Sequence, residues 1–230
     1  MARQARFSDS VNSFHSNMQR YYEDVVSGVN TRAVTDGCDP GSVRTGTDSC
    51  LLIGRVISFT EDSSDGIVRY ATASSAVPDT GSIYDQLRVG SVTVQSSGEQ
   101  TINLAWGALF QNASRASGVI GAQPLKQAGS TRALVNNVAF LRHPNGSEIV
   151  PYFFYSTNST LASVQSGLTT VLNALSVASA TTATICITTS PTEYAATAAP
   201  VAAILLGTGT GSASIDTNYS PTRGPAGVCE

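Results

Sequence analysis

Apolar residues near the start of the chain recur at steps of four and three, which places them on one stripe of an α-helix. Polar and charged residues occupy the opposite side of the same segment. Ser8 is suited to cap the start of this helix, and Gly28 is suited to end it. The pattern predicts an amphipathic N-terminal helix, and its stripe consists of Phe7, Val11, Phe14, Met18, Tyr21 and Val25.

After residue 50 the apolar segments become short and are separated by turn residues, which is typical of β-strands. Residues 31–49 are rich in Gly, Asp, Thr and Ser without periodicity, and we expect them to form a connecting loop. The segments on either side of Asp65-Gly66 predict one hairpin. The segments flanking Asn145-Gly146 predict another, because Asn-Gly accepts the positive φ angles of a two-residue turn.

Two of the predicted strands carry more specific information. The four aromatic residues at positions 152–155 point to both faces of one strand, which predicts that both faces of its sheet are covered. A phase change at Gly90-Ser91 predicts a β-bulge. Residues 101–110 alternate strictly, which predicts one continuous strand whose core face holds Ile102, Leu104, Trp106, Ala108 and Phe110.

A second helical pattern interrupts the strands at residues 161–175, although Gly167 weakens it. Residues 208–230 have no core-forming pattern and are expected to form a flexible C-terminal tail. The apolar runs between these segments number about eight, with turns at short intervals. The sequence therefore predicts a mainly β fold: a helical arm and loop over residues 1–49, followed by an eight-stranded antiparallel jelly-roll-like sandwich over residues 50–207.

The composition narrows the class of protein. Charged residues make up only 13% of the 230 residues, about half the usual share, while hydrophobic residues make up 41%. Such a chain suits a β-rich protein whose surface is covered by hydroxyl groups or buried against copies of itself. The net charge of −3 argues against strong nucleic-acid binding.

Targeting signals and paired cysteines are not evident. No apolar segment follows the arginines of the first ten residues, so we expect no secretory signal, and no apolar run is long enough to span a membrane. Cys38, Cys50, Cys186 and Cys229 lack the paired spacing of a zinc site, and free thiols are the default expectation. A disulfide between Cys38 and Cys50 stays open as an alternative.

The motifs that resemble sites lack the context that their chemistry requires. Gly207, Gly209 and Gly211 are not followed by the helix that a dinucleotide loop must open. Neither His15 nor His143 lies in a nucleophile motif. The acidic turn at residues 61–65 lacks the ligand spacing of an EF-hand. We therefore expect no catalytic residue, no metal and no cofactor, although a carboxylate pair brought together from distant strands stays open.

In organisation, the arm at residues 1–49 and the strands at 50–207 resemble the single jelly-roll capsid proteins of small icosahedral viruses. The resemblance implies a self-assembling shell subunit, located in the virion, whose arm reaches neighbouring copies. Because the six-residue stripe is apolar, we expect it to dock on the β-domain of another copy, and folding of the helix back onto its own sheet stays open as the alternative. The partners of this subunit would be other copies and further shell proteins, with no membrane. The arm departs from a densely basic one because Arg3, Arg6, Arg20 and Arg32 stand beside Asp9, Glu23 and Asp24, which implies weak or no direct nucleic-acid binding.

Three other classes of function stay open. One is a carbohydrate-binding or adhesin-like sandwich that would use Trp106 or exposed tyrosines. The second is a phage tail or decoration protein, and the third is an enzyme with a dispersed carboxylate site.

Overall fold

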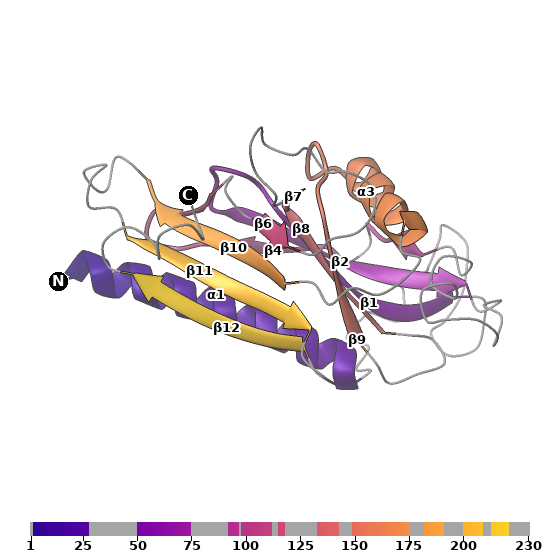
Figure 1. Ribbon diagram of the computed structural model, residues 1–230, viewed down its shortest axis with the longest axis horizontal. Helices are drawn as coiled ribbons and strands as arrows, with labels where there is room; N and C mark the ends of the chain where they lie inside the picture. Colours follow the sequence, from indigo (N-terminus) through magenta and orange to yellow (C-terminus); the bar gives the residue numbers. More distant parts are fainter. Residues whose placement is uncertain are drawn as a thin grey trace.

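The computed structural model describes ten segments of the chain. The described residues are 2–27, 50–74, 92–96, 98–111, 115–117, 133–142, 149–174, 182–190, 200–208 and 213–220. Within them the chain forms two helices and twelve strands, and the strands pair antiparallel in two sheets (Figure 1). The predicted mainly β architecture is confirmed at this level, with more strands than the eight expected.

The first sheet has the strand order β3-β2-β1-β8-β9, and β4 pairs with β2. Its strands are β1 (Cys50–Phe59), β2 (Asp65–Ser74), β3 (Thr93–Val94), β4 (Gln100–Asn103), β8 (Asn137–Arg142) and β9 (Ile149–Phe154). The second sheet has the order β12-β11-β10-β6-β7, and β5 pairs with β10. Its strands are β5 (Ala108–Phe110), β6 (Arg115–Ser117), β7 (Ala133–Leu134), β10 (Thr182–Thr189), β11 (Val201–Thr208) and β12 (Ala213–Ser220).

Both predicted hairpin pairings are present in the first sheet. Strand β1 pairs with β2 from Phe59 opposite Gly66 to Cys50 opposite Ser74. Asp65 and Gly66 lie at the start of β2 rather than in the turn. Strand β8 pairs with β9 up to Arg142 opposite Ile149, while the turn at Asn145-Gly146 lies outside the described residues. The bulge predicted at Gly90-Ser91 also lies outside them, but the register of β1 shifts between Leu52 and Gly54.

The main core lies between the two sheets and helix α1 (Ala2–Ser27). The helix begins at Ala2, so Ser8, the residue expected to cap it, lies inside the helix. Helix α1 runs beside β12 along one side of the molecule (Figure 1). Inner-face residues of both sheets, among them Ile57, Phe140 and Ile204, pack with its stripe in one buried cluster.

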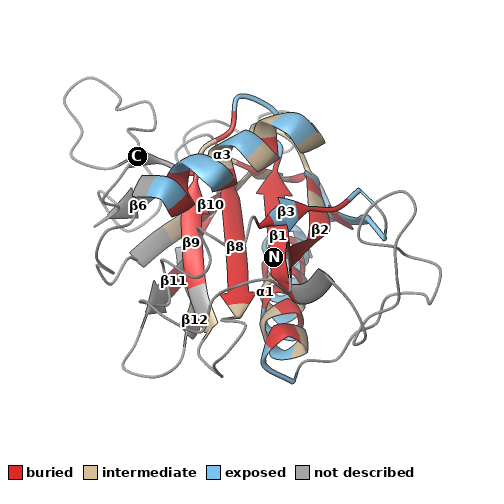
Figure 2. Ribbon diagram, turned by 90° about the vertical axis from the view of Figure 1, so that its right-hand side faces the viewer, coloured by how far each residue is buried: buried red, intermediate tan, exposed pale blue. Residues whose placement is uncertain are grey.

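A second core lies on the outer face of the first sheet, beneath helix α3 (Leu161–Ala174). Val164 and Leu168 of α3 pack with Tyr152 and Phe154 of β9 there, whereas Phe153 faces the main core. Figure 2 shows buried residues along β8 and β9 and exposed ones along the outer side of α3. The prediction that the strand at 152–155 is covered on both faces is thereby confirmed for these residues.

Two features of the second sheet correct the sequence-based expectations. Residues 213–220, expected to belong to a flexible tail, form β12 and pair with β11 along its whole length. Backbone hydrogen bonds to β11 hold this strand, and Ala213, Ile215 and Tyr219 alternate with polar residues along it, a strand pattern that the expectation of a tail overlooked. Cys186 of β10 is buried and disulfide-bonded, so the expectation of a free thiol is wrong at this position. Which cysteines approach one another depends on tertiary structure and not on spacing.

Candidate interaction surface

The predicted interaction stripe is buried in the chain's own core. All six of its residues belong to the cluster that α1 shares with the two sheets. Phe14 makes edge-to-face contacts with Phe59 and Phe110, whose ring centroids lie 5.9 Å and 5.2 Å from its own. Within this chain the helix therefore covers its own sheets, and contact of the stripe with a neighbouring copy stays a prediction.

Polar contacts hold α1 in place at two points along its length. His15 Nε2 lies 2.9 Å from the carbonyl oxygen of Ile215 in β12. Near the end of the helix, Arg55 of β1 donates to Asp24 at 3.3 Å. The guanidinium of Arg55 lies 3.9 Å from the ring centroid of Tyr70, which stacks the charge on an aromatic face. Both contacts join residues far apart in the sequence.

Trp106 lies in a tight turn and not in the predicted continuous strand. Trp106 and Gly107 have φ angles of 58° and 72°, and the Ala108 N–H donates to the carbonyl of Ala105 at 3.2 Å, as in a type I′ turn. The turn joins β4 of the first sheet to β5 of the second. Leu104 and Phe110 are buried as predicted, but Trp106 is 59% exposed, so its predicted core position is wrong.

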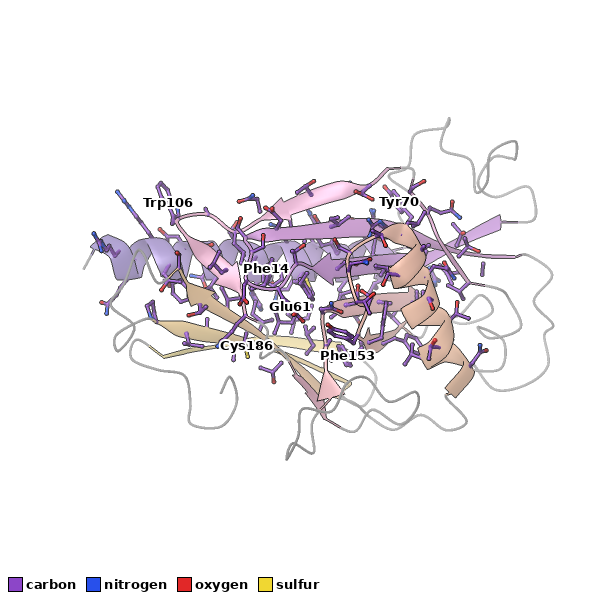
Figure 3. All side chains as sticks on the ribbon, turned by 90° about the horizontal axis from the view of Figure 1, so that it is seen from above. Phe14, Glu61, Tyr70, Trp106, Phe153 and Cys186 are labelled. Atoms are coloured by element: carbon purple, nitrogen blue, oxygen red, sulfur yellow. The ribbon has the colours of Figure 1, made fainter. Side chains whose placement is uncertain are left out.

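Arg6 of α1 lies beside this exposed ring. Its guanidinium carbon lies 4.9 Å from the centroid of Trp106, a cation–π contact. Figure 3 shows Trp106 next to the N-terminal part of α1, far from Tyr70 at the other end of the helix. The neighbouring residues Arg3 and Ala105 are also exposed. The arrangement presents an aromatic ring and positive charge together at one end of the molecule.

A hydrogen bond joins the acidic segment at residues 61–65 to strand β4. Asp65 Oδ1 accepts from Asn103 Nδ2 at 2.8 Å. Burial raises the pKa of the Glu61 carboxyl above its usual range, and the nearby charge of Asp62 raises it further. Burial raises the pKa of the Tyr155 hydroxyl, and the nearby charge of Glu61 raises it further. Among the described residues, no group of three or more His, Cys, Asp or Glu side chains is placed to hold a metal ion.

A buried polar network joins the start of β8 to the segment before α3. Asn136 Nδ2 donates to the Ser156 carbonyl at 2.7 Å, and Asn137 Nδ2 donates to Ser156 Oγ at 2.9 Å. Ser156 Oγ donates in turn to the Asn158 carbonyl. The network gives most of these polar groups a partner, although Asn137 Oδ1 has none, and it connects β8 to the segment that leads into α3. Adjacent asparagines in an apolar run were its only sequence signal.

Several residues weighed as site candidates lie outside the described residues. They are His143, Lys126, Gly209, Gly211, Cys38 and Cys229.

In the described part of the chain, no helix combines the length and apolar character needed to cross a membrane. Comparison of the chain with protein-family models, curated protein sequences and solved structures finds no match.

Proposed function

We propose that the chain is a structural subunit that assembles with copies of itself, and that the assembly is a viral shell. One observation carries this proposal. Helix α1 supplies six large side chains to the main core, yet residues 28–49 separate it in sequence from β1. A chain of that length spans at most about 70 Å when extended, at 3.3 Å per residue. The same core could therefore be completed by α1 of a neighbouring copy, as in domain swapping.

The sparse charge of the sequence supports the same function. With 13% charged residues, little electrostatic repulsion opposes close packing of copies. The capsid resemblance rests on the organisation of the chain as a helical arm and a β-sandwich. A phage tail or decoration protein would share this organisation. Virion localisation and further shell proteins as partners belong to this proposal. The jelly-roll connection stays a prediction, since the described hairpins keep consecutive strands in one sheet, whereas a jelly roll is built from two Greek keys.

The chain offers a direct test of arm exchange because it has only two methionines, Met1 and Met18. Met18 is buried in the main core. We would produce the full chain with photo-methionine, mix ¹⁴N- and ¹⁵N-labelled copies before assembly, irradiate, and map the cross-links by mass spectrometry. A Met18→Leu variant, carrying the label only at Met1, is the matched control.

We expect particles or rings by electron microscopy and cross-links that join position 18 of one isotope form to β1 or β8 of the other. Cross-links confined to single chains within assembled particles would contradict arm exchange and leave assembly standing. A monodisperse monomer over the whole concentration range would overturn the proposed function.

The exposure of Trp106 favours a carbohydrate-binding module as a second candidate, since sugars stack on exposed aromatic rings. Arg6 occupies one side of this ring, and Tyr152, Phe153 and Phe154 are buried, so the described residues offer no extended aromatic platform. Trp106 is the only tryptophan in the chain, so its fluorescence reports on this ring alone. A saturable fluorescence change with oligosaccharides, in a chain that remains monomeric, would favour this candidate.

A further inference from the structure

We infer that the two ends of α1 are complementary contact surfaces through which one copy binds the next head to tail. The basic end comprises Arg3, Arg6 and Trp106, and the acidic end comprises Glu23, Asp24 and Val26. The inference rests on the proposed function, because it names the surfaces and the partner of the assembly. The partner is a second copy of this chain.

The first support is the placement of exposed apolar side chains. Among the described residues, the exposed large hydrophobic side chains are Trp106 at 59% and Val26 at 50%. Trp106 lies against Arg6 in the first turns of α1, and Val26 lies in its last turn. Twenty residues of α-helix separate positions 6 and 26, a rise of about 30 Å. The two exposed apolar side chains therefore lie near opposite ends of α1.

The second support is the backbone strain at Trp106. A φ of 58° is unfavourable for a bulky aromatic residue, and type I′ turns favour Asn or Gly at this position. The fold thus holds the largest apolar side chain in a disfavoured conformation while exposing it to water. Strained residues that persist commonly mark contact or functional sites. Tryptophan is also among the residues most enriched in the energetic centres of protein interfaces.

The third support is the direction of charge along α1. The first turn contains Arg3 and no acidic residue, and the last turn contains Asp24 and no basic residue, while Asp9 and Arg20 lie more than one turn inside these ends. A helix dipole is positive at its N-terminus and negative at its C-terminus, so this order adds charge of the same sign at each end. Arg55 compensates Asp24, while Glu23 is exposed. Placing the basic end of one copy against the acidic end of another would bring these like charges at each helix end next to charges of opposite sign.

These surfaces differ from each other, which determines the symmetry of the contact. A two-fold contact through the basic end would place Arg6 against Arg6. A head-to-tail contact pairs unlike surfaces and leaves one of each free, so it propagates into a ring or a helical filament.

The first test is Trp106→Asn in the untagged full chain, with Trp106→Phe as the matched variant. Asn suits a positive φ, so we expect a melting temperature equal to or above that of the wild type. We expect association, measured by sedimentation equilibrium, to weaken about tenfold or more. Trp106→Phe keeps an aromatic ring and should associate within about threefold of the wild type. A lower melting temperature with unchanged association would assign Trp106 a structural role and overturn the inference.

The second test reverses the charges at the two ends. Arg6→Glu and Glu23→Arg should each weaken association, since each places like charges across the contact. The double variant, which again opposes unlike charges, should recover it, and so should an equimolar mixture of the two single variants. Asn173→Glu on the exposed side of α3 controls for added charge and should have no effect.

The outcomes separate the inference from the proposed function. If the wild-type chain does not associate, the proposed function fails. If the wild type associates and the double variant associates no better than the single ones, assembly uses other surfaces and the head-to-tail inference is wrong.

Discussion

At the scale of single residues, Arg55 illustrates how a charge is accommodated inside this fold. Its side chain is 3% exposed, and it contacts the carboxylate of Asp24 and the ring of Tyr70. An unpaired charge at such a depth would carry a large desolvation cost. The ion pair joins α1 to β1, so it helps to hold the C-terminal end of α1 against the first sheet.

Glu61 presents the opposite case, a carboxyl whose charged form is disfavoured in the folded state. Burial raises its pKa above the ordinary value of 4.5, and Asp62 raises it further. As pH rises, the unfolded chain loses this proton first, so the folded state becomes less stable between pH 4.5 and the raised pKa. The full destabilisation is present above that pKa and absent below pH 4.5.

We therefore expect Glu61→Gln to raise the melting temperature at pH 7 and to leave it unchanged below about pH 4, where wild-type Glu61 is protonated in both states. Thermal unfolding followed by circular dichroism from pH 3.5 to pH 8 measures the difference. Asp65→Asn, at an exposed position at the start of β2, serves as the comparison. A gain that is the same at every pH would contradict the role of ionisation.

At the scale of elements, the packing of α3 depends on a glycine. A Cβ at Gly167 would lie 2.8 Å from Phe154 Cδ2 and 3.0 Å from the Tyr155 carbonyl oxygen. Gly167 thus permits the close approach of α3 to β9. In sequence this glycine weakens the helical pattern, and the packing explains why it is nevertheless present. Gly54 has the same role between β1 and β8, where a Cβ would lie 1.9 Å from the Phe140 carbonyl oxygen.

Gly167→Ala sets helix propensity against packing. Alanine favours the helix by about 1 kcal/mol, whereas overpacking typically costs about 1–3 kcal/mol. Because one of the close atoms belongs to the backbone, we expect a net destabilisation of about 1–2 kcal/mol. Chemical denaturation measures it, and Ser166→Ala on the exposed side should stabilise slightly. A gain of stability from Gly167→Ala would show that α3 can move away from β9 at little cost.

At the scale of the whole molecule, α1 and both sheets share one core and should unfold together. Phe14 contacts aromatic residues of both sheets and is fully buried. We expect Phe14→Ala to cost about 3–5 kcal/mol, the range for large buried aromatics. Helix circular dichroism and Trp106 fluorescence should lose their native signals in a single transition.

The exposed position Ser16 of the same helix provides the control, since Ser16→Ala should change stability by less than about 0.5 kcal/mol. Separate transitions for the helix signal and for Trp106 would show that α1 unfolds independently of the sheets. This outcome would contradict the shared core.

The sequence by itself determined the features that show as a regular spacing of apolar residues along a short segment. The stripe of α1, the helix at 161–174, the pairing of β1 with β2 and of β8 with β9, and the double covering of the aromatic strand all followed from spacing. Each depends on neighbours within a few residues, and a side chain that faces a core must be apolar whatever packs against it.

Only the tertiary structure decided which surfaces meet. Alternation continued in phase through Trp106, although the chain turns there and changes sheets. Strand β12 shows only a weak alternation, at Ala213, Ile215 and Tyr219, and its pairing with β11 is what identifies it as a strand. The partners of Arg55 and His15 lie 31 and 200 residues away in sequence. Local spacing records that a side chain is buried or exposed, whereas the identity of its contact depends on how distant segments fold against one another.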